Sequence, residues 1–145
     1  MTRINIVPPQ SLMDQHLMAE FREIRHIGPS LQRSMNSKNF HKVKSTISKS
    51  YTLNKGHVMF FYDKGLYLYK RFLDIRDELL NRGFNINKDT EFNLHLFPDD
   101  YKGDYTPTMD EIQINLDRIN LRISEKQNFY KKTKHKIGII ENEIT

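Results

Sequence analysis

The sequence predicts a compact all-α fold in a single domain, and two observations support this. Apolar residues recur at helical spacing in three stretches, and capping or helix-breaking residues bound each stretch. Only residues 58–62 look like a strand, and no second strand is available to pair with them. A length of 145 residues suits one hydrophobic core. We therefore expect three main helices with long loops in one domain over residues 1–145.

The first expected helix follows a pair of prolines. Ser11 stands where an N-cap belongs, and Asp14 follows three residues later as a capping-box-like partner. Gly28-Pro29 should break or kink this helix, because proline lacks a backbone N–H and its ring clashes with the preceding turn. Residues 30–57 are rich in serine, asparagine, lysine and histidine without a strong period, so we expect weak helix and then loop.

The second expected helix should follow Asp63, a plausible cap, and run to about Arg82. Gly83 stands where a left-handed C-terminal cap belongs. Residues 84–107 carry several turn signals and should form a long loop before the third helix.

The third expected helix opens with a capping box formed by Thr108 and Glu111. Arg118 and Arg122 are four residues apart and so share one face of it. Such a pair can clamp phosphates, although a solvated helix face would carry the same residues. The net charge of +5 favours phosphate contact, because a basic small domain is drawn to nucleic acid.

Composition and motifs exclude several kinds of chemistry. The chain has no cysteine, which rules out disulfides, iron–sulfur clusters and thiol catalysis. Neither GxGxxG nor GxxxxGK(S/T) occurs, and the six histidines lack the HExxH spacing of zinc hydrolases. No apolar run reaches the roughly 18 residues of a membrane span. We expect no metal site and no membrane contact.

The N-terminus is itself a candidate catalytic group. A small residue at position 2 normally permits removal of Met1, so the mature chain would begin at Thr2. The pKa of a free α-amino group is near 8, against about 10.4 for lysine, so more of it is neutral at pH 7. A neutral amine can attack the C1′ atom of a nucleotide sugar. Most proteins with threonine at this position use the amine for nothing, and composition leaves that alternative open.

Three polar residues of the first expected helix could assist that amine. His16, Glu20 and Glu23 are spaced to lie along one side of the helix. A carboxylate beside an iminium can stabilise its charge and accept the C2′ proton of the sugar. An exposed polar face with ordinary ion pairs would use the same residues, and the pattern by itself favours that plainer explanation.

Five segments, in order along the chain, resemble one enzyme family. They are MTRINIV, DQHLMAEFRE, GHVMFFYDK, RGFNI and GDYTP. They resemble the phage-type pyrimidine-dimer DNA glycosylase with AP-lyase activity, and the similarity runs from residue 2 to about residue 131. The second and third segments are long, irregular strings, so the resemblance is specific.

The resemblance implies that an N-terminal segment threads between the helices of a compact all-α fold. It implies cleavage at the 5′ nucleotide of cis-syn cyclobutane pyrimidine dimers in double-stranded DNA, followed by β-elimination, which nicks the strand. Thr2 would be the nucleophile and Glu23 the essential carboxylate. No metal or organic cofactor would be needed. The family suggests a monomer that acts on DNA in the cytoplasm of a cell, with a phage, viral or microbial origin.

The resemblance also implies a set of DNA contacts. The matching residues line the site, hold phosphates or serve dimer recognition: Arg3, Gln15, His16, Arg22, His26, Arg118, Arg122, Phe129, Tyr130 and Lys131.

Two places depart from the family pattern. His26 replaces an arginine that holds phosphate, and histidine is largely neutral at pH 7. We therefore expect weaker or more pH-dependent DNA binding. Residues 129–133 read Phe-Tyr-Lys-Lys-Thr, where the family has an aromatic string of the Trp-Tyr-Lys-Tyr-Tyr type. In the family that segment serves dimer recognition, so the departure bears on lesion choice rather than on lyase chemistry. Residues 137–145 form a tail beyond the similarity.

Two alternative functions remain open. The same amine and carboxylate could act on abasic sites or ring-opened purines, with a shifted lesion choice. A basic DNA-binding protein without chemistry would share the charge and the helices, but it would not need Thr2 or Glu23.

Overall fold

The computed structural model describes residues 3–37 and 42–135, which form helices and connecting loops. No strand occurs in these two ranges, and the predicted all-α fold is confirmed. The first expected helix is in fact two helices, and residues 58–62 lie in a short helix and the turn after it. The α-helices are α1 (Asp14–Glu23), α2 (Ile27–Met35), α3 (His57–Phe60), α4 (Gly65–Asn81) and α5 (Met109–Glu125).

The break between α1 and α2 falls just before Gly28-Pro29. A 3-10 turn, η2 (Ile24–His26), joins the two helices, and Pro29 lies in the first turn of α2. The ring of a proline clashes with the carbonyl four residues earlier, and its missing N–H costs nothing in a first turn. The helical ladder is therefore interrupted on the N-terminal side of Pro29, and the predicted kink is confirmed.

Two predicted caps near the start of α1 are wrong. Ser11 ends a separate 3-10 turn, η1 (Pro9–Ser11), and α1 begins at Asp14 without a side-chain cap. Asp14 forms no capping box because its carboxylate is engaged elsewhere. It pairs with buried Arg82 at 2.9 Å and accepts hydrogen bonds from the backbone and side chain of Thr133.

The predicted cap of α4 is also wrong, because backbone groups replace the side chain of Asp63. The Gly103 carbonyl accepts from the N–H groups of Leu66 and Tyr67 at 3.1 and 3.2 Å. The Gly103 N–H donates to the Asp63 carbonyl at 3.0 Å. A Cβ at position 103 would lie 2.5 Å from that carbonyl oxygen, so the approach requires glycine.

Two further predicted boundaries are confirmed. Gly83 follows the end of α4 with a φ of +90°, the left-handed conformation that favours glycine. Thr108 accepts from the Glu111 N–H, and the Glu111 side chain accepts from the Thr108 N–H, which completes the capping box of α5.

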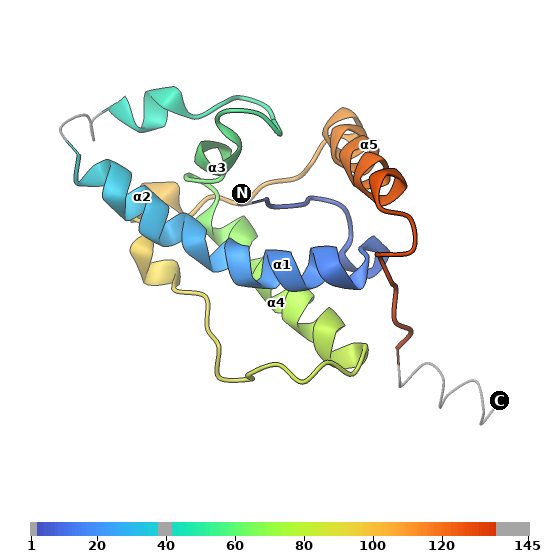
Figure 1. Cartoon of the computed structure of the whole chain (residues 1–145). Coiled ribbons are helices and arrows are strands. Elements are labelled where there is room, and N and C mark those ends of the chain that lie inside the picture. Colours follow the sequence, from blue (N-terminus) through green and yellow to red (C-terminus); the bar gives the residue numbers. More distant parts are fainter. Residues whose placement is uncertain (1–2, 38–41, 136–145) are drawn as a thin grey trace.

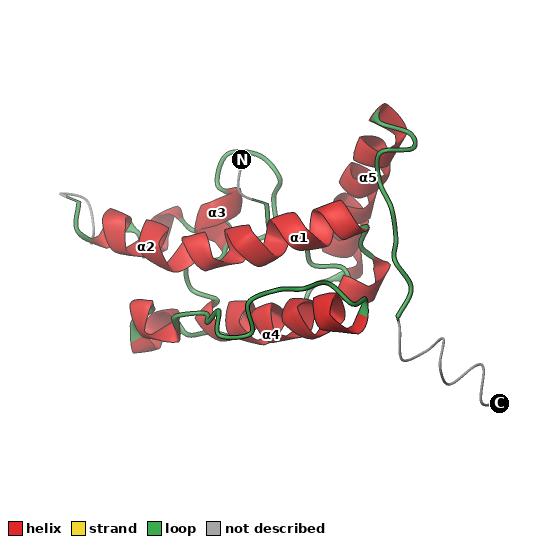
Figure 2. Ribbon diagram, turned by 60° about the horizontal axis from the view of Figure 1, so that its bottom comes forward, coloured by secondary structure: helices red, strands yellow, loops and turns green. Residues whose placement is uncertain are grey.

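The core lies between α1 and α4. Figure 2 shows α1 and α2 end to end in one layer, with α4 in the layer below and α5 at one end. Phe21 of α1 and Phe72 of α4 are buried and stack with their centroids 5.4 Å apart. Complete burial of a side chain of this size stabilises the fold by roughly 1.5–3 kcal/mol. This contact fixes α1, which carries His16, Glu20 and Glu23.

The N-terminal segment, residues 3–7, threads between α1 and α5 without regular secondary structure (Figure 1). Ile4, Ile6 and Val7 are buried in the core. The predicted threading of this segment is therefore confirmed. At the other end of the chain, the tail of residues 137–145 lies outside the described residues.

Candidate active site

A surface hollow of about 320 Å³ lies where the N-terminal segment meets α1, α5 and the segment after α5. We call it the α1 hollow. It brings together residues that are far apart in the sequence, and five of them were predicted site residues. Its lining residues are Arg3, Asn5, His16, Ala19, Glu20, Glu23, Arg122 and Tyr130.

Glu23, the last residue of α1, reaches the start of the described chain. Its Oε2 atom accepts a hydrogen bond from the Arg3 N–H at 3.0 Å. The Arg3 nitrogen belongs to the peptide bond with residue 2, so the carboxylate lies beside the start of the chain. Thr2, the predicted nucleophile, lies outside the described residues.

Glu20 also lines the hollow but has a different environment. It is 1% exposed and forms a buried ion pair with Arg71 of α4. Its Oε1 atom also accepts from the Asn5 side-chain amide at 2.9 Å. Because its carboxylate binds both Arg71 and Asn5, Glu20 links α1 to α4 and to the N-terminal segment. Glu23 is left as the acidic residue beside the chain start.

Asn115 of α5 holds the middle of the N-terminal segment. Its Oδ1 atom accepts from the N–H groups of Ile6 and Val7 at 2.7 and 3.3 Å, and its Nδ2 donates to the Asn5 side chain at 2.9 Å. Asn115 is fully buried. One side chain thus satisfies backbone groups that a neighbouring strand would satisfy in a sheet.

His57 and Tyr51 hold the N-terminal segment at Ile4. His57 Nε2 accepts from the Ile4 N–H at 2.8 Å, and the Tyr51 hydroxyl donates to the Ile4 carbonyl at 2.9 Å. Since Nε2 is the acceptor, Nδ1 carries the proton and donates to the Thr52 carbonyl at 2.7 Å. Burial lowers the pKa of His57; the Thr52 hydrogen bond opposes this effect and the charge of Arg3 adds to it. His57 is therefore a neutral acceptor at pH 7.

Sequence analysis missed His57, Asn115 and Tyr51 as anchors of the segment. His57 stands within the recognised segment GHVMFFYDK, which could have drawn attention to it. Asn115 and Tyr51 carried no signal, because their roles depend on contacts more than 45 residues away in the chain.

Two arginines, Arg3 and Arg122, line the hollow, and a third, Arg118, is near enough for its charge to act on Arg3. Burial lowers the pKa of Arg3, and the charges of Arg118 and Arg122 lower it further, while Tyr51 and Glu23 oppose this effect. The Nη1 atom of Arg3 is buried without a hydrogen-bond partner among residues 3–37 and 42–135. A cluster of cations favours an anion, and a DNA phosphate carries the matching charge.

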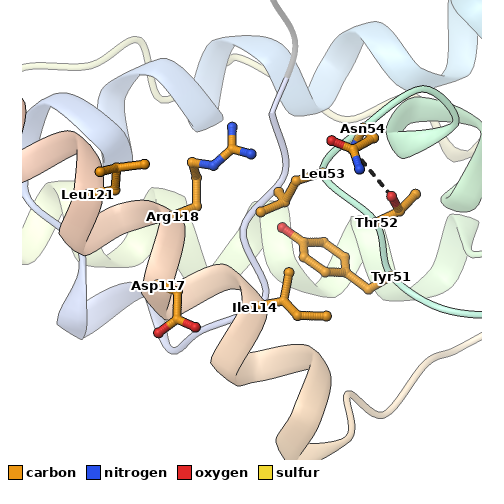
Figure 3. A pocket seen from close by; sticks show the side chains of 8 residues that line it. All are labelled: Tyr51, Thr52, Leu53, Asn54, Ile114, Asp117, Arg118 and Leu121. Atoms are coloured by element: carbon orange, nitrogen blue, oxygen red, sulfur yellow. Dashed lines mark hydrogen bonds between the residues drawn. The ribbon is translucent and has the colours of Figure 1, made fainter.

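Arg118 also lines a second cleft, of about 380 Å³, between α5 and residues 51–54 (Figure 3). In this view its side chain extends from α5 beside the N-terminal segment. Ile114 and Leu121 flank it on α5 and are 44% and 52% exposed. The cleft therefore combines one cation, Arg118, and one acidic residue, Asp117, with apolar and polar neighbours.

His16 and Tyr130 form one wall of the α1 hollow. Their rings stack with centroids 4.5 Å apart. Burial lowers the pKa of His16, and the charges of Arg3 and Arg122 add to this effect. His16 is therefore neutral at pH 7, and its ring presents a flat surface to Tyr130.

The other predicted DNA contacts lie around the hollow, not in it. Arg22 and His26 are exposed and four residues apart, on either side of Glu23. Gln15 is half-buried, and its amide hydrogen-bonds to the backbone of Phe129 and Lys131, both of which are exposed. These five remain predicted DNA contacts.

A comparison with known families gives the site its context. The profile of the family described as pyrimidine dimer DNA glycosylase matches residues 1–92, more than half of the chain. The chain belongs to this family. Its function class is therefore that of a DNA glycosylase of DNA repair, with pyrimidine dimers in DNA as the substrate class. The matched region contains Arg3 and Glu23, whereas α5 and the segment after it lie beyond the match.

Two structural searches bear on other sites. Within residues 3–37 and 42–135, no group of three or more histidine, aspartate or glutamate side chains could hold a metal ion. No helix in the same ranges has the length and hydropathy needed to cross a membrane.

Proposed function

We propose that this protein cuts DNA at cyclobutane pyrimidine dimers with the α-amino group of Thr2 as nucleophile and Glu23 as the assisting carboxylate. The substrate is the 5′ nucleotide of the dimer in duplex DNA. The reaction has two stages, cleavage of the glycosidic bond and nicking of the strand. Removal of Met1 is a requirement of this proposal.

In the first stage the neutral amine attacks C1′ of the sugar. A C1′–N bond forms while the glycosidic bond breaks; the pyrimidine takes the electron pair and a proton and stays joined to the 3′ pyrimidine through the cyclobutane ring. The nitrogen then loses a proton, the C1′–O4′ bond breaks and O4′ takes up a proton, which opens the sugar ring and leaves an iminium at C1′. Glu23, beside this positive charge, stabilises it electrostatically.

In the second stage Glu23 accepts the C2′ proton from the iminium sugar. The electrons of that bond form a C2′–C3′ double bond, the C3′–O bond breaks, and the 3′ phosphate leaves. Water then hydrolyses the iminium and frees the amine. The reaction uses a nucleophile and a proton acceptor from the chain itself.

The hydrogen bond from Arg3 N–H to Glu23 is the observation that carries this proposal. Covalent geometry keeps the α-amino nitrogen of residue 2 within about 4 Å of the Arg3 nitrogen. A carboxylate that is hydrogen-bonded to the Arg3 N–H therefore lies close enough to act on an adduct of the amine. The neighbouring cations Arg3, Arg118 and Arg122 support the same proposal, because they suit the phosphates that flank a lesion.

Borohydride trapping tests the proposal. The protein, with removal of Met1 verified by mass spectrometry, is incubated with a duplex that holds one defined thymine dimer, and the adduct is mapped. We expect a covalent adduct on the Thr2 amine. A matched preparation that retains Met1 should give none.

A second duplex with a single abasic site distinguishes the alternatives. An adduct on the abasic duplex alone would support a lyase with a different lesion choice, which the sparse aromatic content of residues 129–133 favours. No adduct on either duplex would refute the proposed chemistry.

A further inference from the structure

The segment after α5 is held against the N-terminal end of α1 in a repeating pattern. Figure 1 shows this segment, in red, as it passes the start of α1. The Asp14 N–H donates to the Lys131 carbonyl at 2.7 Å, and the Lys131 N–H donates to Gln15 Oε1 at 3.0 Å. Residue 131 thus binds α1 through both of its backbone groups, as a residue does at the edge of a sheet.

The residues on either side of Lys131 continue the pattern. Gln15 Nε2 donates to the Phe129 carbonyl at 2.9 Å. The Thr133 N–H donates to Asp14 Oδ1 at 3.1 Å, and its hydroxyl donates to Asp14 Oδ2 at 2.6 Å. Alternate residues, 129, 131 and 133, therefore face α1 through their backbone.

Gln15 forms hydrogen bonds to the residues on both sides of Tyr130. Its two amide atoms bind the residue before and the residue after Tyr130, so they fix the backbone direction at position 130. The Tyr130 ring then stacks on His16, at 4.5 Å, and lines the α1 hollow. The Tyr130 side chain is thus oriented by hydrogen bonds that its two neighbours in the chain form with Gln15.

The Asp14 side of this arrangement is supported from the core. Arg82 is 2% exposed and pairs with both Asp14 and Glu78, at 2.9 and 2.7 Å. Glu78 in turn contacts His135 Nε2 at 2.7 Å. A buried arginine therefore gives the surface segment a rigid attachment point at the C-terminal end of α4.

We infer that Gln15 and Asp14 are positioning residues that clamp residues 129–133 and set Tyr130 as the wall of the α1 hollow that selects the lesion. The inference rests on the proposed function for its substrate. It gives Gln15 a different role from the predicted direct DNA contact, because both ends of its amide are engaged within the protein. The wall matters for a bulky dimer and matters little for an abasic sugar, which has no base to place against it.

The test uses Gln15→Met, which keeps the side-chain length and the helix propensity but removes both hydrogen bonds. Gln10→Met, at an exposed position before α1, is the matched control. Thr133→Val is a second variant at the other end of the clamp, with Thr106→Val as its control. Because residue 133 lies on the exposed segment after α5, this variant should leave the packing of the core unchanged.

The first readout does not depend on activity. In Gln15→Met, amide exchange at Lys131 should accelerate about five- to tenfold. The NMR signals of the His16 ring should also move, since they lose the ring current of Tyr130. Neither control should change. Unaltered exchange and unaltered His16 signals in Gln15→Met would overturn the clamp.

The second readout compares substrates. Gln15→Met should raise KM for the dimer duplex about five- to tenfold, with a smaller rise for Thr133→Val. In Thr133→Val, at a residue that is not a predicted DNA contact, cleavage of an abasic duplex should stay within about twofold of wild type. Equal losses on both duplexes, or none on the dimer, would overturn the inference. A wild-type protein that does not cleave dimers would instead refute the proposed function, while the exchange measurement would still test the clamp.

Discussion

The two ends of the described chain both lie against α1, but they are held in opposite ways. Residues 3–7 are mostly buried, and side chains from α3, α4 and α5 satisfy their backbone groups from inside the core. Residues 129–133 are mostly exposed, and polar side chains at the start of α1 hold them at the surface. Residues 3–7, beside Glu23, are therefore anchored in the core, whereas residues 129–133 can be altered without disturbing the core.

This difference fits the two tasks of the proposed reaction. Attack on C1′ requires the nucleophile at a set distance and angle, which a buried anchor provides. A wall that faces the lesion requires a set orientation but no place in the core, which the surface clamp of residues 129–133 provides. The comparison predicts that changes near the N-terminal segment abolish chemistry or stability, and that changes near the C-terminal segment alter only selectivity.

The largest effect is expected for Glu23→Gln. Loss of the carboxylate removes the proton acceptor and the stabilising charge, so strand cleavage should fall by about 10²–10⁴-fold. Because Glu23 is half-buried and glutamine has nearly the same shape, the free energy of unfolding should stay unchanged. Single-turnover cleavage and urea unfolding measure the two quantities, with Glu91→Gln as the exposed control. Wild-type cleavage in Glu23→Gln would remove this residue from the mechanism.

The next effect is on stability. Asn115→Ala leaves the buried N–H groups of Ile6 and Val7 without an acceptor, at a cost of about 3 kcal/mol in the free energy of unfolding. Asn120→Ala, exposed on the same helix, should change it by less than about 0.5 kcal/mol. Urea unfolding compares them. Equal stabilities would mean that the N-terminal segment is not anchored in the core.

A smaller effect comes from pH. The pKa of His57 is lowered from its ordinary 6.5 in the folded protein, chiefly by burial. Below about pH 6.5 the unfolded chain binds a proton that the folded chain does not, so stability should fall as the pH falls. The slope for one such group is at most about 1.4 kcal/mol per pH unit.

His57→Gln tests this origin of the pH dependence. The amide oxygen of glutamine can still accept from the Ile4 N–H, but it does not titrate. The loss of stability between about pH 6.5 and 5.5 should therefore be shallower than in wild type. His16, whose pKa is also lowered, keeps some slope in the variant. An unchanged slope, or the same change in the exposed control His95→Gln, would show that His57 is not the source.

The smallest effect is expected for Arg118→Gln. Loss of one phosphate contact should reduce the slope of log K against log salt concentration by about 0.9, with a modest loss of affinity. Arg76→Gln on α4 is the control and should leave the slope unchanged. Fluorescence anisotropy over a salt series measures both variants. A wild-type slope in Arg118→Gln would exclude this arginine from the phosphate contacts.

The sequence predicted the parts of the fold that depend on local chemistry. Gly83 and the Thr108 capping box could be identified because each acts through near neighbours. Asp14 and Asp63 were wrong as capping residues for the opposite reason. Arg82 and Thr133 engage the Asp14 carboxylate, and Gly103 takes the place of Asp63. Ser11 failed locally, because it ends a separate turn.

The same distinction separates the two glutamates of α1. Helical spacing placed Glu20 and Glu23 on one side, as the structure has them, and both line the α1 hollow. Spacing could not show that Arg71, 51 residues away, would occupy Glu20 and leave Glu23 beside the start of the chain. The resemblance to a family, and not the helical pattern, singled out Glu23.

The central claim is that the buried anchor of residues 3–7 fixes the Thr2 amine beside Glu23. The most direct test inserts one glycine between Thr2 and Arg3, so that every contact of residues 3–7 is kept while the amine moves along the chain by about 3.8 Å. We expect unchanged urea unfolding and a loss of about 100-fold in the rate of borohydride trapping on the dimer duplex. Trapping at the wild-type rate, or an adduct that maps to a lysine, would contradict the account.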